Sequence, residues 1–366
     1  MKKYPYGRQC IQQDDINAVV EALSSDFITC GPRVTEFEKA IRTYTGAKYC
    51  VAVSNGTAAL HLAMLASDIK SGDEVITSPI TFLASANCAK FCGANVVFAD
   101  IESDTANISA SEIENKITAQ TKAIIPVHFA GQSCDMEKIY DIAKRNNIIV
   151  VEDAAHAIGS DYKDTKVGSC KYSDMTTFSF HPVKTITTGE GGAITTNSET
   201  LYKKLLAYRA HGMHKDGDML TDWRYEMREL GYNYRITDVQ CALGLSQMKK
   251  LDSFKARRRQ IVDFYNKNLG LPHLVEKDFS NACFHLYPIL IENRKEFFHK
   301  AREVGLMLQI HYIPIYQQPY YAQFGYNPAD YPNAEAYYKR CISLPVYPDL
   351  TDEDLCEIVK RIKEIL

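Results

Sequence analysis

Residues 49–66 read YCVAVSNGTAALHLAMLA. A short run of consecutive apolar residues, Tyr49–Val53, is followed by a turn that contains Asn55 and Gly56 and then by an apolar helical segment over 57–66. Consecutive apolar residues are typical of a strand buried on both faces, because alternate side chains point to opposite sides of a sheet. The stretch therefore predicts a strand, a tight turn and a helix, which is the first half of a βαβ unit.

The same pattern of short apolar runs and longer amphipathic segments continues along the chain. This alternation is typical of right-handed βαβ units, and it predicts an α/β fold built on a parallel sheet. Further strands are predicted at Glu74–Thr77, Asn95–Phe98, Ala123–Val127, Ile148–Glu152, Met175–Ser179 and Gly192–Thr196, with helices at 82–92, 136–146 and 198–209.

The pattern changes after a polar and aromatic stretch at 210–236. Chains of this length usually divide into two domains. We therefore place a boundary near residue 250, with a large domain over residues 1–250 and a smaller one over 251–366. Beyond the polar stretch we predict helices at 238–248, 251–268, 294–303 and 351–365, and strands at His285–Leu290 and Leu308–Ile310.

Charge and composition exclude several classes of protein. The chain has 42 Lys and Arg against 45 Asp and Glu, a net charge of −3, which argues against a generic nucleic-acid binder. No apolar run approaches the roughly 20 residues of a membrane helix, and the N-terminal lysines precede no secretory signal. The 11 cysteines include no C-x-x-C pair, and no metal-ligand spacing is found. We expect a soluble cytoplasmic protein without a metal, membrane or nucleic-acid partner.

Three groups of residues at predicted strand ends could carry chemistry. Gly56 and Thr57 open a helix whose free N–H groups could bind a phosphate, although an ordinary N-cap uses similar residues. Asp153 ends a buried strand and could bond a protonated ring nitrogen, or it could cap the next element. Lys184 precedes a glycine-rich turn at 189–192, where a desolvated amine could form a Schiff base, whereas most lysines are solvated surface charges.

A fourth group lies in the polar and aromatic stretch. Asn233 and Arg235 alternate with Tyr232 and Tyr234, which suits recognition of phosphate or carboxylate, although the tyrosines could instead pack a loop. Together, a phosphate cradle, a strand-end acid and a lysine before a turn are what pyridoxal phosphate requires. The acid keeps the pyridine nitrogen protonated and the lysine holds the aldehyde. Phe82, just after a strand, is placed to cover the ring.

The sequence resembles the DegT/StrS family of pyridoxal-phosphate sugar aminotransferases over nearly its whole length. The matching stretches follow in the family's order: TCGPRVTEFE at 29–38, GTAAL at 56–60, GDEVI at 72–76, TF at 81–82, EDAAH at 152–156, FSF at 178–180 with Lys184 and GEGG at 189–192, and GYNYR at 231–235. The resemblance implies fold type I: a large domain with a mostly parallel seven-stranded sheet, and a small C-terminal α+β domain.

The resemblance also implies roles for particular residues. Lys184 would be the Schiff-base lysine and general base, Asp153 would pair with the pyridine nitrogen, and Phe82 would stack on the ring. Asn233 would reach the cofactor phosphate of a neighbouring subunit, so that a homodimer shares its active sites. His156 would stand near the ring hydroxyl, and Gly56, Thr57 and Ser179 would hold the phosphate.

Within the family, residues 155–159, 181–188, 286–290 and 311–314 are most similar to transaminases of the pseudaminic acid pathway. These move an amino group from L-glutamate to C4 of a UDP-linked 4-keto-6-deoxy-N-acetylhexosamine. The alternative is a UDP-4-keto-6-deoxy-D-GlcNAc, as in bacillosamine or legionaminic acid synthesis, or another nucleotide-linked keto-sugar. By the same resemblance the sugar nucleotide would face Tyr6, Phe27, Ile28, Thr29, Arg235, His311 and Tyr312.

Three other functions fit parts of the sequence. A pyridoxal-phosphate enzyme of another class, such as a sugar dehydratase, would use the same scaffold. A non-enzymatic binding protein could have adopted the fold, but Lys184 and Asp153 are both intact and argue against it. A nicotinamide-binding protein would share the α/β pattern, but no G-x-G-x-x-G follows the first strand.

Overall fold

The computed structural model describes residues 2–214 and 223–366. Its central element is a seven-stranded sheet in the order β2-β10-β9-β6-β5-β3-β4. Only β10 in this sheet runs antiparallel to its neighbours, so the predicted mostly parallel sheet is confirmed. Its strands are β2 (Tyr49–Val53), β3 (Glu74–Thr77), β4 (Asn95–Phe98), β5 (Thr121–Ile125), β6 (Ile149–Asp153), β9 (Met175–Ser179) and β10 (Gly192–Thr196).

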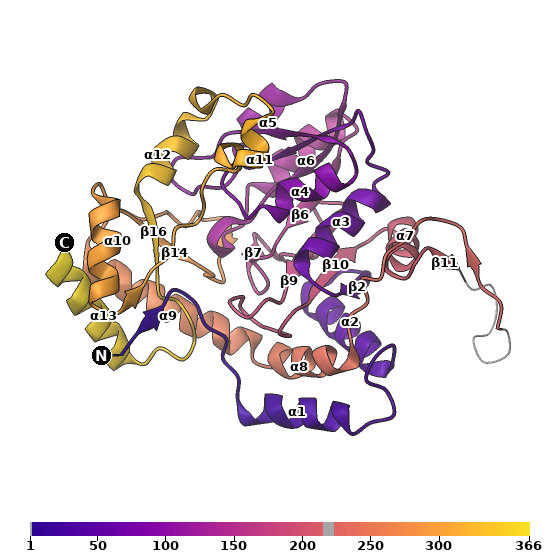
Figure 1. Cartoon of the computed structure of the whole chain (residues 1–366), viewed down its shortest axis with the longest axis horizontal. Coiled ribbons are helices and arrows are strands. Elements are labelled where there is room, and N and C mark those ends of the chain that lie inside the picture. The colour runs from indigo at the N-terminus through magenta and orange to yellow at the C-terminus, as the bar shows by residue number, and fades with distance from the viewer. Residues whose placement is uncertain (1, 215–222) are drawn as a thin grey trace.

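Helices cover both faces of the sheet (Figure 1). On β2, Val51 and Val53 pack on the face that carries α3, α4 and α7, whereas Cys50 and Ala52 pack on the face that carries α2 and α8. Both faces being buried explains the consecutive apolar residues of these strands. The covering helices are α2 (Pro32–Thr45), α3 (Gly56–Ala66), α4 (Ala84–Phe91), α5 (Ala110–Lys116), α6 (Met136–Arg145), α7 (Glu199–Arg209) and α8 (Asp238–Met248).

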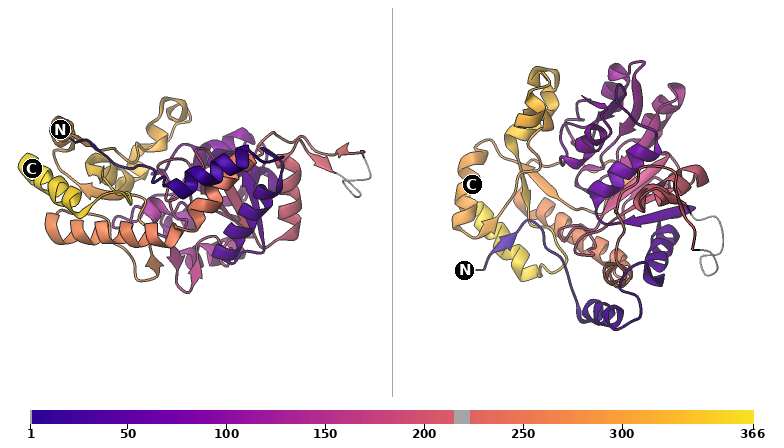
Figure 2. Two further views of the ribbon diagram at one scale, coloured as in Figure 1. Left: turned by 90° about the horizontal axis from the view of Figure 1, so that it is seen from below. Right: turned by 45° about the vertical axis from the view of Figure 1, so that its right-hand side comes forward.

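A second hydrophobic core forms beside the sheet from the C-terminal part of the chain. There β14 (Tyr287–Leu290) pairs antiparallel with β16 (Cys341–Leu344). The long helix α9 leads into this part of the molecule (Figure 2). The helices that pack on this core are α9 (Leu251–Leu269), α10 (Arg294–Glu303) and α13 (Asp352–Ile365).

The N-terminal segment crosses to this second core. β1 (Tyr4–Pro5) pairs parallel with β15 (Leu306–Met307), and the hydroxyl of buried Tyr4 donates to Asp354 on α13. Conversely, part of the C-terminal region packs with the core of the large sheet, including Tyr321, Tyr337 and Cys341. The division at residue 250 therefore stays a prediction.

The sequence favours helical structure over residues 14–45 with an extended break at 27–32, which agrees with α1 (Gln13–Leu23) and α2. Several shorter elements were not predicted. β15 lies two residues before the strand predicted at Leu308–Ile310, because its partner is β1 at the other end of the chain. The remaining elements are β7 (Asp161–Tyr162), β8 (Thr165–Lys166), β13 (Ser280–Asn281), α11 (Pro319–Ala322), α12 (Pro332–Arg340) and the 3₁₀ turns Phe129–Gly131, Ile315–Gln317 and Pro328–Asp330.

A two-stranded arm projects from the body next to α7 (Figure 1). It consists of β11 (Met213–His214) and β12 (Glu226–Met227), which pair antiparallel. Beside β12, Trp223 is 87% exposed and Leu230 is 74% exposed. Large apolar side chains at such exposure mark a surface that another molecule could cover. No helix in the described ranges combines the length and apolar character that crossing a membrane requires.

The α2–α8 contact allows a test of the packing. Gly244 of α8 faces the ring of fully buried Phe37, and a Cβ at this position would lie 2.7 Å from the ring atoms Cε2 and Cζ. Although alanine is the better helix former, we expect Gly244→Ala to lower the free energy of unfolding by about 1–3 kcal/mol through overpacking, measured by urea denaturation.

A double-mutant cycle with Phe37→Leu identifies the cause. If the clash is with the ring, the double variant loses less stability than the sum of the two single variants. Strict additivity would contradict this account of the α2–α8 contact.

Candidate active site

Four strand ends meet at one edge of the sheet and place the candidate residues there. β2 leads into Gly56, β6 ends at Asp153 and β9 ends at Ser179, five residues before Lys184. The segment after β3 carries Phe82. The carboxyl edge of a parallel sheet is where α/β proteins bind ligands, so the predicted residues lie on the expected edge.

The first turn of α3 forms an anion cradle. The Asn55 side chain accepts from the Ala58 N–H at 2.8 Å, which leaves the N–H groups of Gly56 and Thr57 without an intrahelical acceptor. A Cβ at Gly56 would lie 2.8 Å from Cβ of Ser179, so only glycine lets the Ser179 hydroxyl stand beside this helix end. These two N–H groups and one hydroxyl suit a phosphate.

The turn after Lys184 supports the same cradle. A Cβ at Gly192, the first residue of β10, would lie 2.5 Å from the Asn55 carbonyl oxygen. Glycine is therefore required for β10 to approach the start of α3 this closely. The glycine-rich turn positions the helix end that carries the cradle.

Asp153 is a buried carboxylate, 5% exposed. Its Oδ2 accepts from the Ser85 hydroxyl at 2.6 Å, and its Oδ1 accepts from the Ala155 N–H at 3.1 Å. Within the described ranges no cation pairs with it. Each carboxylate oxygen can accept a further hydrogen bond. A buried charge is stable only when it is paired, so this carboxylate is arranged to receive a cationic N–H donor.

Lys184 lies within electrostatic reach of Asp153. Desolvation lowers the pKa of its amine to about 8, although the charge of Asp153 acts in the opposite direction. Burial and the charge of Lys184 also lower the pKa of His156 well below its ordinary value and that of His311 to about 3. The imidazoles are therefore neutral at pH 7, and Lys184 has a readily accessible free-amine form.

Aromatic side chains from distant parts of the chain contact one another near His156 and His311, the imidazoles that the charge of Lys184 influences. The Tyr312 hydroxyl and Nε2 of His156 form a hydrogen bond of 3.1 Å, and the Tyr312 ring lies 6.3 Å from Phe82 between centroids. The His311 ring lies 4.7 Å from Tyr6. Residues predicted for the cofactor, His156 and Phe82, thus contact residues predicted for the sugar. Phe82 is 56% exposed, so its ring face is open.

Two residues near the site were not predicted. Ser85 bonds Asp153, and the only sequence signal for it is a hydroxyl residue in the first turn of the helix after Phe82. His285 packs against His156 with ring centroids 4.4 Å apart, and Nδ1 of both rings is buried without a partner in the described part of the chain. A histidine at the start of an otherwise apolar strand was its only signal.

The other predicted contacts form a separate group. Phe27, Ile28 and Thr29 are exposed, and Thr29 bridges to Thr237, close in sequence to Arg235. Arg235 is half-buried, and within the described residues it makes no ion pair. The loop reaches the cradle through the Ser54 N–H, which donates to the carbonyl oxygen of Tyr234.

Asn233 lies at the base of the projecting arm, where it bridges to Ala210. Its side chain is exposed and makes no hydrogen bond to Gly56, Thr57 or Ser179 in the described structure. Its predicted role toward a neighbouring subunit is not tested by a single chain and stays a prediction.

These residues fit pyridoxal phosphate. The α3 cradle matches its phosphate, the unpaired carboxylate of Asp153 matches its ring nitrogen, and the amine of Lys184 matches its aldehyde. The fit rests on the close approach of Gly56 to Ser179 and on a buried acid that pairs with no cation among the residues described. Among the residues described, no group of three or more His, Cys, Asp or Glu side chains is arranged to hold a metal.

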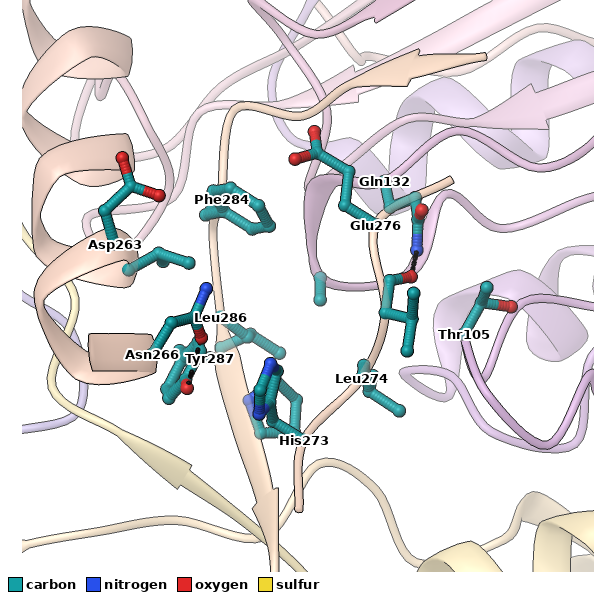
Figure 3. Close-up of a pocket in the computed structure, with 14 residues that line it drawn as sticks. Thr105, Gln132, Asp263, Asn266, His273, Leu274, Glu276, Phe284, Leu286 and Tyr287 are labelled. Atoms are coloured by element: carbon teal, nitrogen blue, oxygen red, sulfur yellow. Dashed lines mark hydrogen bonds between the residues drawn. The ribbon is translucent and has the colours of Figure 1, made fainter. Parts of the chain in front are cut away.

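A cavity of about 150 Å³ lies between α9 and the segment around His273 (Figure 3). Phe284 and Leu286 line it, whereas His285 between them contacts His156. Two polar groups at its wall are already paired: Gln132 donates to the Val275 carbonyl, and Glu276 pairs with Arg259. The cavity is therefore separate from the candidate active site.

Comparison with known proteins identifies the family to which the sequence is similar. The sequence profile of the DegT/DnrJ/EryC1/StrS aminotransferase family matches residues 9–363. The UDP-4-amino-4,6-dideoxy-N-acetyl-β-L-altrosamine transaminase of Campylobacter jejuni (strain 81-176) is 39% identical, with 98% of each chain covered. The GDP-perosamine synthase of Escherichia coli O157:H7 is 38% identical, with 100% of this chain and 99% of that protein covered.

Solved structures share the fold. Helicobacter pylori PseC, an aminotransferase involved in the biosynthesis of pseudoaminic acid, has a TM-score of 0.93 and 34% identity, covering 100% of this chain and 99% of that one. The sugar aminotransferase Spr1654 of Streptococcus pneumoniae in its pyridoxal-phosphate form has a TM-score of 0.92 and 30% identity, with 100% of both chains covered.

The lowered pKa of Lys184 predicts a distinctive reactivity in the cofactor-free protein. Amine reagents attack only the neutral amine, so the labelling rate rises with pH through the pKa. We expect a midpoint near pH 8 at Lys184, measured by mass spectrometry of labelled peptides. Asp153→Asn removes a charge that raises this pKa, so the midpoint should move lower.

Lys203 is the matched control. Its hydrogen bond to Glu199 holds the pKa of its amine above the ordinary value, so it should label only at more alkaline pH. Equal midpoints for the two lysines would show that Lys184 is not desolvated.

Proposed function

The chain belongs to the DegT/DnrJ/EryC1/StrS aminotransferase family and is a pyridoxal-phosphate-dependent aminotransferase of nucleotide sugars, and we propose that it moves the amino group of L-glutamate to C4 of a UDP-4-keto-6-deoxy-N-acetylhexosamine. The product would be UDP-4-amino-4,6-dideoxy-N-acetyl-β-L-altrosamine. The observation that carries the proposal is the desolvated amine of Lys184 within electrostatic reach of the buried Asp153 carboxylate. The Campylobacter relative and PseC support this choice of substrate.

Each part of the site has a task in holding the cofactor. Gly56, Thr57 and Ser179 would hold the phosphate, Asp153 would accept a hydrogen bond from the protonated ring nitrogen, and Phe82 would lie on the ring. His156 would stand near the ring hydroxyl. The bound cofactor supplies an electron sink for the carbanion that forms at Cα of the amino donor.

Lys184 would move the protons. With a pKa of about 8, a useful fraction of the amine is neutral near pH 7 to 8, as a general base requires. In the first half-reaction Nζ of Lys184 takes the proton from Cα of glutamate. In the second it delivers a proton to C4 of the sugar. Nitrogen passes from glutamate to the sugar, and 2-oxoglutarate leaves.

The sugar would bind beside neutral aromatic side chains. Tyr6, His311 and Tyr312 lie next to the cofactor residues, and the neutral imidazole of His311 can donate or accept a hydrogen bond from a sugar hydroxyl. Phe27, Ile28 and Thr29 would extend this surface. Arg235, which has no ion pair among the residues described, is suited to a carboxylate or phosphate of a substrate.

A different acceptor is the main alternative. The GDP-perosamine synthase of Escherichia coli is nearly as similar as the Campylobacter transaminase, which supports another nucleotide-linked keto-sugar. UDP-4-keto-6-deoxy-D-GlcNAc is a further candidate. These acceptors differ in ring stereochemistry and in the nucleotide, so substrate assays distinguish them.

We also propose a homodimer with shared sites. The arm exposes Trp223 and Leu230, large apolar side chains that a second copy of the chain could cover. Asn233 at the base of this arm is exposed and would complete the cradle of the partner.

All eleven cysteines of the chain are free, which supports a reducing compartment, the cytoplasm.

A panel of keto-sugar nucleotides tests the substrate. With glutamate, we expect kcat/KM for the UDP-linked L-arabino 4-keto sugar to exceed that for its D-gluco-type epimer and for a GDP-linked 4-keto-6-deoxy sugar by at least about tenfold. Products are identified by mass spectrometry and NMR. A preference for either competitor would replace the proposed acceptor.

Lys184→Ala is the control for the chemistry. It should lower kcat by about 10²–10⁴-fold, and borohydride treatment of the wild type should attach the cofactor mass to the Lys184 peptide. Turnover by Lys184→Ala at the wild-type rate would contradict the assignment.

Mixing two inactive variants tests the shared site. In a mixed dimer of Lys184→Ala and Asn233→Ala subunits, one site keeps its own lysine and receives an intact Asn233 from the partner. Random mixing should therefore restore roughly a quarter of wild-type activity, measured after co-refolding or co-expression. If Asn233 serves its own subunit, no intact site forms and the mixture stays inactive.

A further inference from the structure

We propose that Ser85 is a positioning residue that fixes the Asp153 carboxylate by donating its hydroxyl proton to Oδ2. The bond is 2.6 Å long, and both side chains are buried. The inference rests on the proposed function, because the position of Asp153 matters only if the carboxylate faces the cofactor ring.

The directions of the hydrogen bonds follow from the chemistry of the groups. An ionised carboxylate can only accept hydrogen bonds, so the Ser85 hydroxyl must donate its single proton to Asp153. The Phe82 carbonyl, 3.3 Å from the same hydroxyl, is the more distant and uncharged acceptor. The Thr81 hydroxyl, 2.8 Å from Ser85, must then donate to Ser85. Proton donation therefore runs in one direction, from Thr81 to Ser85 to Asp153.

Burial makes this chain of bonds effective. Ser85 is 0% exposed and Thr81 is 3% exposed. Water competes little at such sites, and hydrogen bonds that polarise one another are strengthened. A donor to the charged form of a carboxylate lowers its basicity. Ser85 would therefore keep the shared proton on the ring nitrogen rather than on Asp153, which maintains the electron sink.

The same segment of chain controls a second contact of the ring. Thr81 and Phe82 lie just before α4, and Ser85 lies in its first turn. The stacking residue and the donor to the acid are therefore joined by three peptide units. The Ala155 N–H holds the other carboxylate oxygen, at 3.1 Å, so that both oxygens are fixed.

Among the described residues, the charge of Asp153 acts on Lys184, Tyr312 and Cys88. Burial raises the pKa of Tyr312 and of Cys88, so both stay neutral across the working range. A change in the pH response of the holoenzyme therefore reports on Lys184 and the cofactor.

The test uses Ser85→Ala in the holoenzyme. We expect the pH midpoint of the visible absorbance of the cofactor to rise by about one unit, because the ring nitrogen loses positive charge. We also expect kcat to fall about tenfold with little change in the KM for glutamate. Absorbance titration and steady-state kinetics measure the two effects.

Ser85→Thr keeps the hydroxyl. It should therefore keep the pH midpoint of the wild type and a kcat within roughly twofold of the wild-type value. Cys88→Ala, which trims a buried side chain one turn further along α4, should leave the midpoint unchanged. If circular dichroism shows that Ser85→Thr does not fold, Thr81→Val replaces it and should shift the midpoint in the same direction by a smaller amount.

An unchanged midpoint in Ser85→Ala would overturn the proposal, as would an equal shift in Cys88→Ala. Failure of the proposed function looks different. In that case Asp153→Asn would also leave the midpoint and kcat unchanged, and borohydride would leave the Lys184 peptide unmodified.

Discussion

A buried carboxylate without a cation is the constraint on which the rest of this structure depends. Asp153 is nearly inaccessible and is held by neutral donors on both oxygens. Desolvating such a charge is costly unless a partner compensates for it. The charge of Asp153 raises the pKa of the Lys184 amine, but the two side chains form no ion pair in the described structure. The end of β6 and the segment that follows β9 therefore bring opposite charges near each other without pairing them in the described part of the chain.

Much of the sheet and of the candidate site could be predicted from the sequence, because the site residues lie at the ends of buried strands. The bounds of β2, β9 and β10 agree with the runs predicted at 49–53, 175–179 and 192–196, since strands covered on both faces keep consecutive apolar residues. Gly56 is the first residue of α3, which follows β2, and Asp153 is the last residue of β6. The parallel topology therefore brings both residues to the carboxyl edge of the sheet. Local pattern thus predicts both the sheet and the polar residues at its carboxyl edge.

The contacts that sequence did not predict join segments that are far apart in the chain. The hydrogen bond between His156 and Tyr312 spans 156 positions, and that between Ser85 and Asp153 spans 68. No periodicity carries such information, because these pairings depend on how α4 and the segment around Tyr312 pack against the core of the large sheet. β15 was placed too late in the chain for the same reason: its register is set by β1.

The pairing of β1 with β15 has a consequence for synthesis of the chain. Tyr4 leaves the ribosome among the first residues, yet its strand partner Leu306 emerges about 300 residues later. Gly7, three residues further on, lies against Val183, the residue before Lys184. A nascent chain can therefore form much of the sheet, but β1 meets its strand partner only near the end of translation.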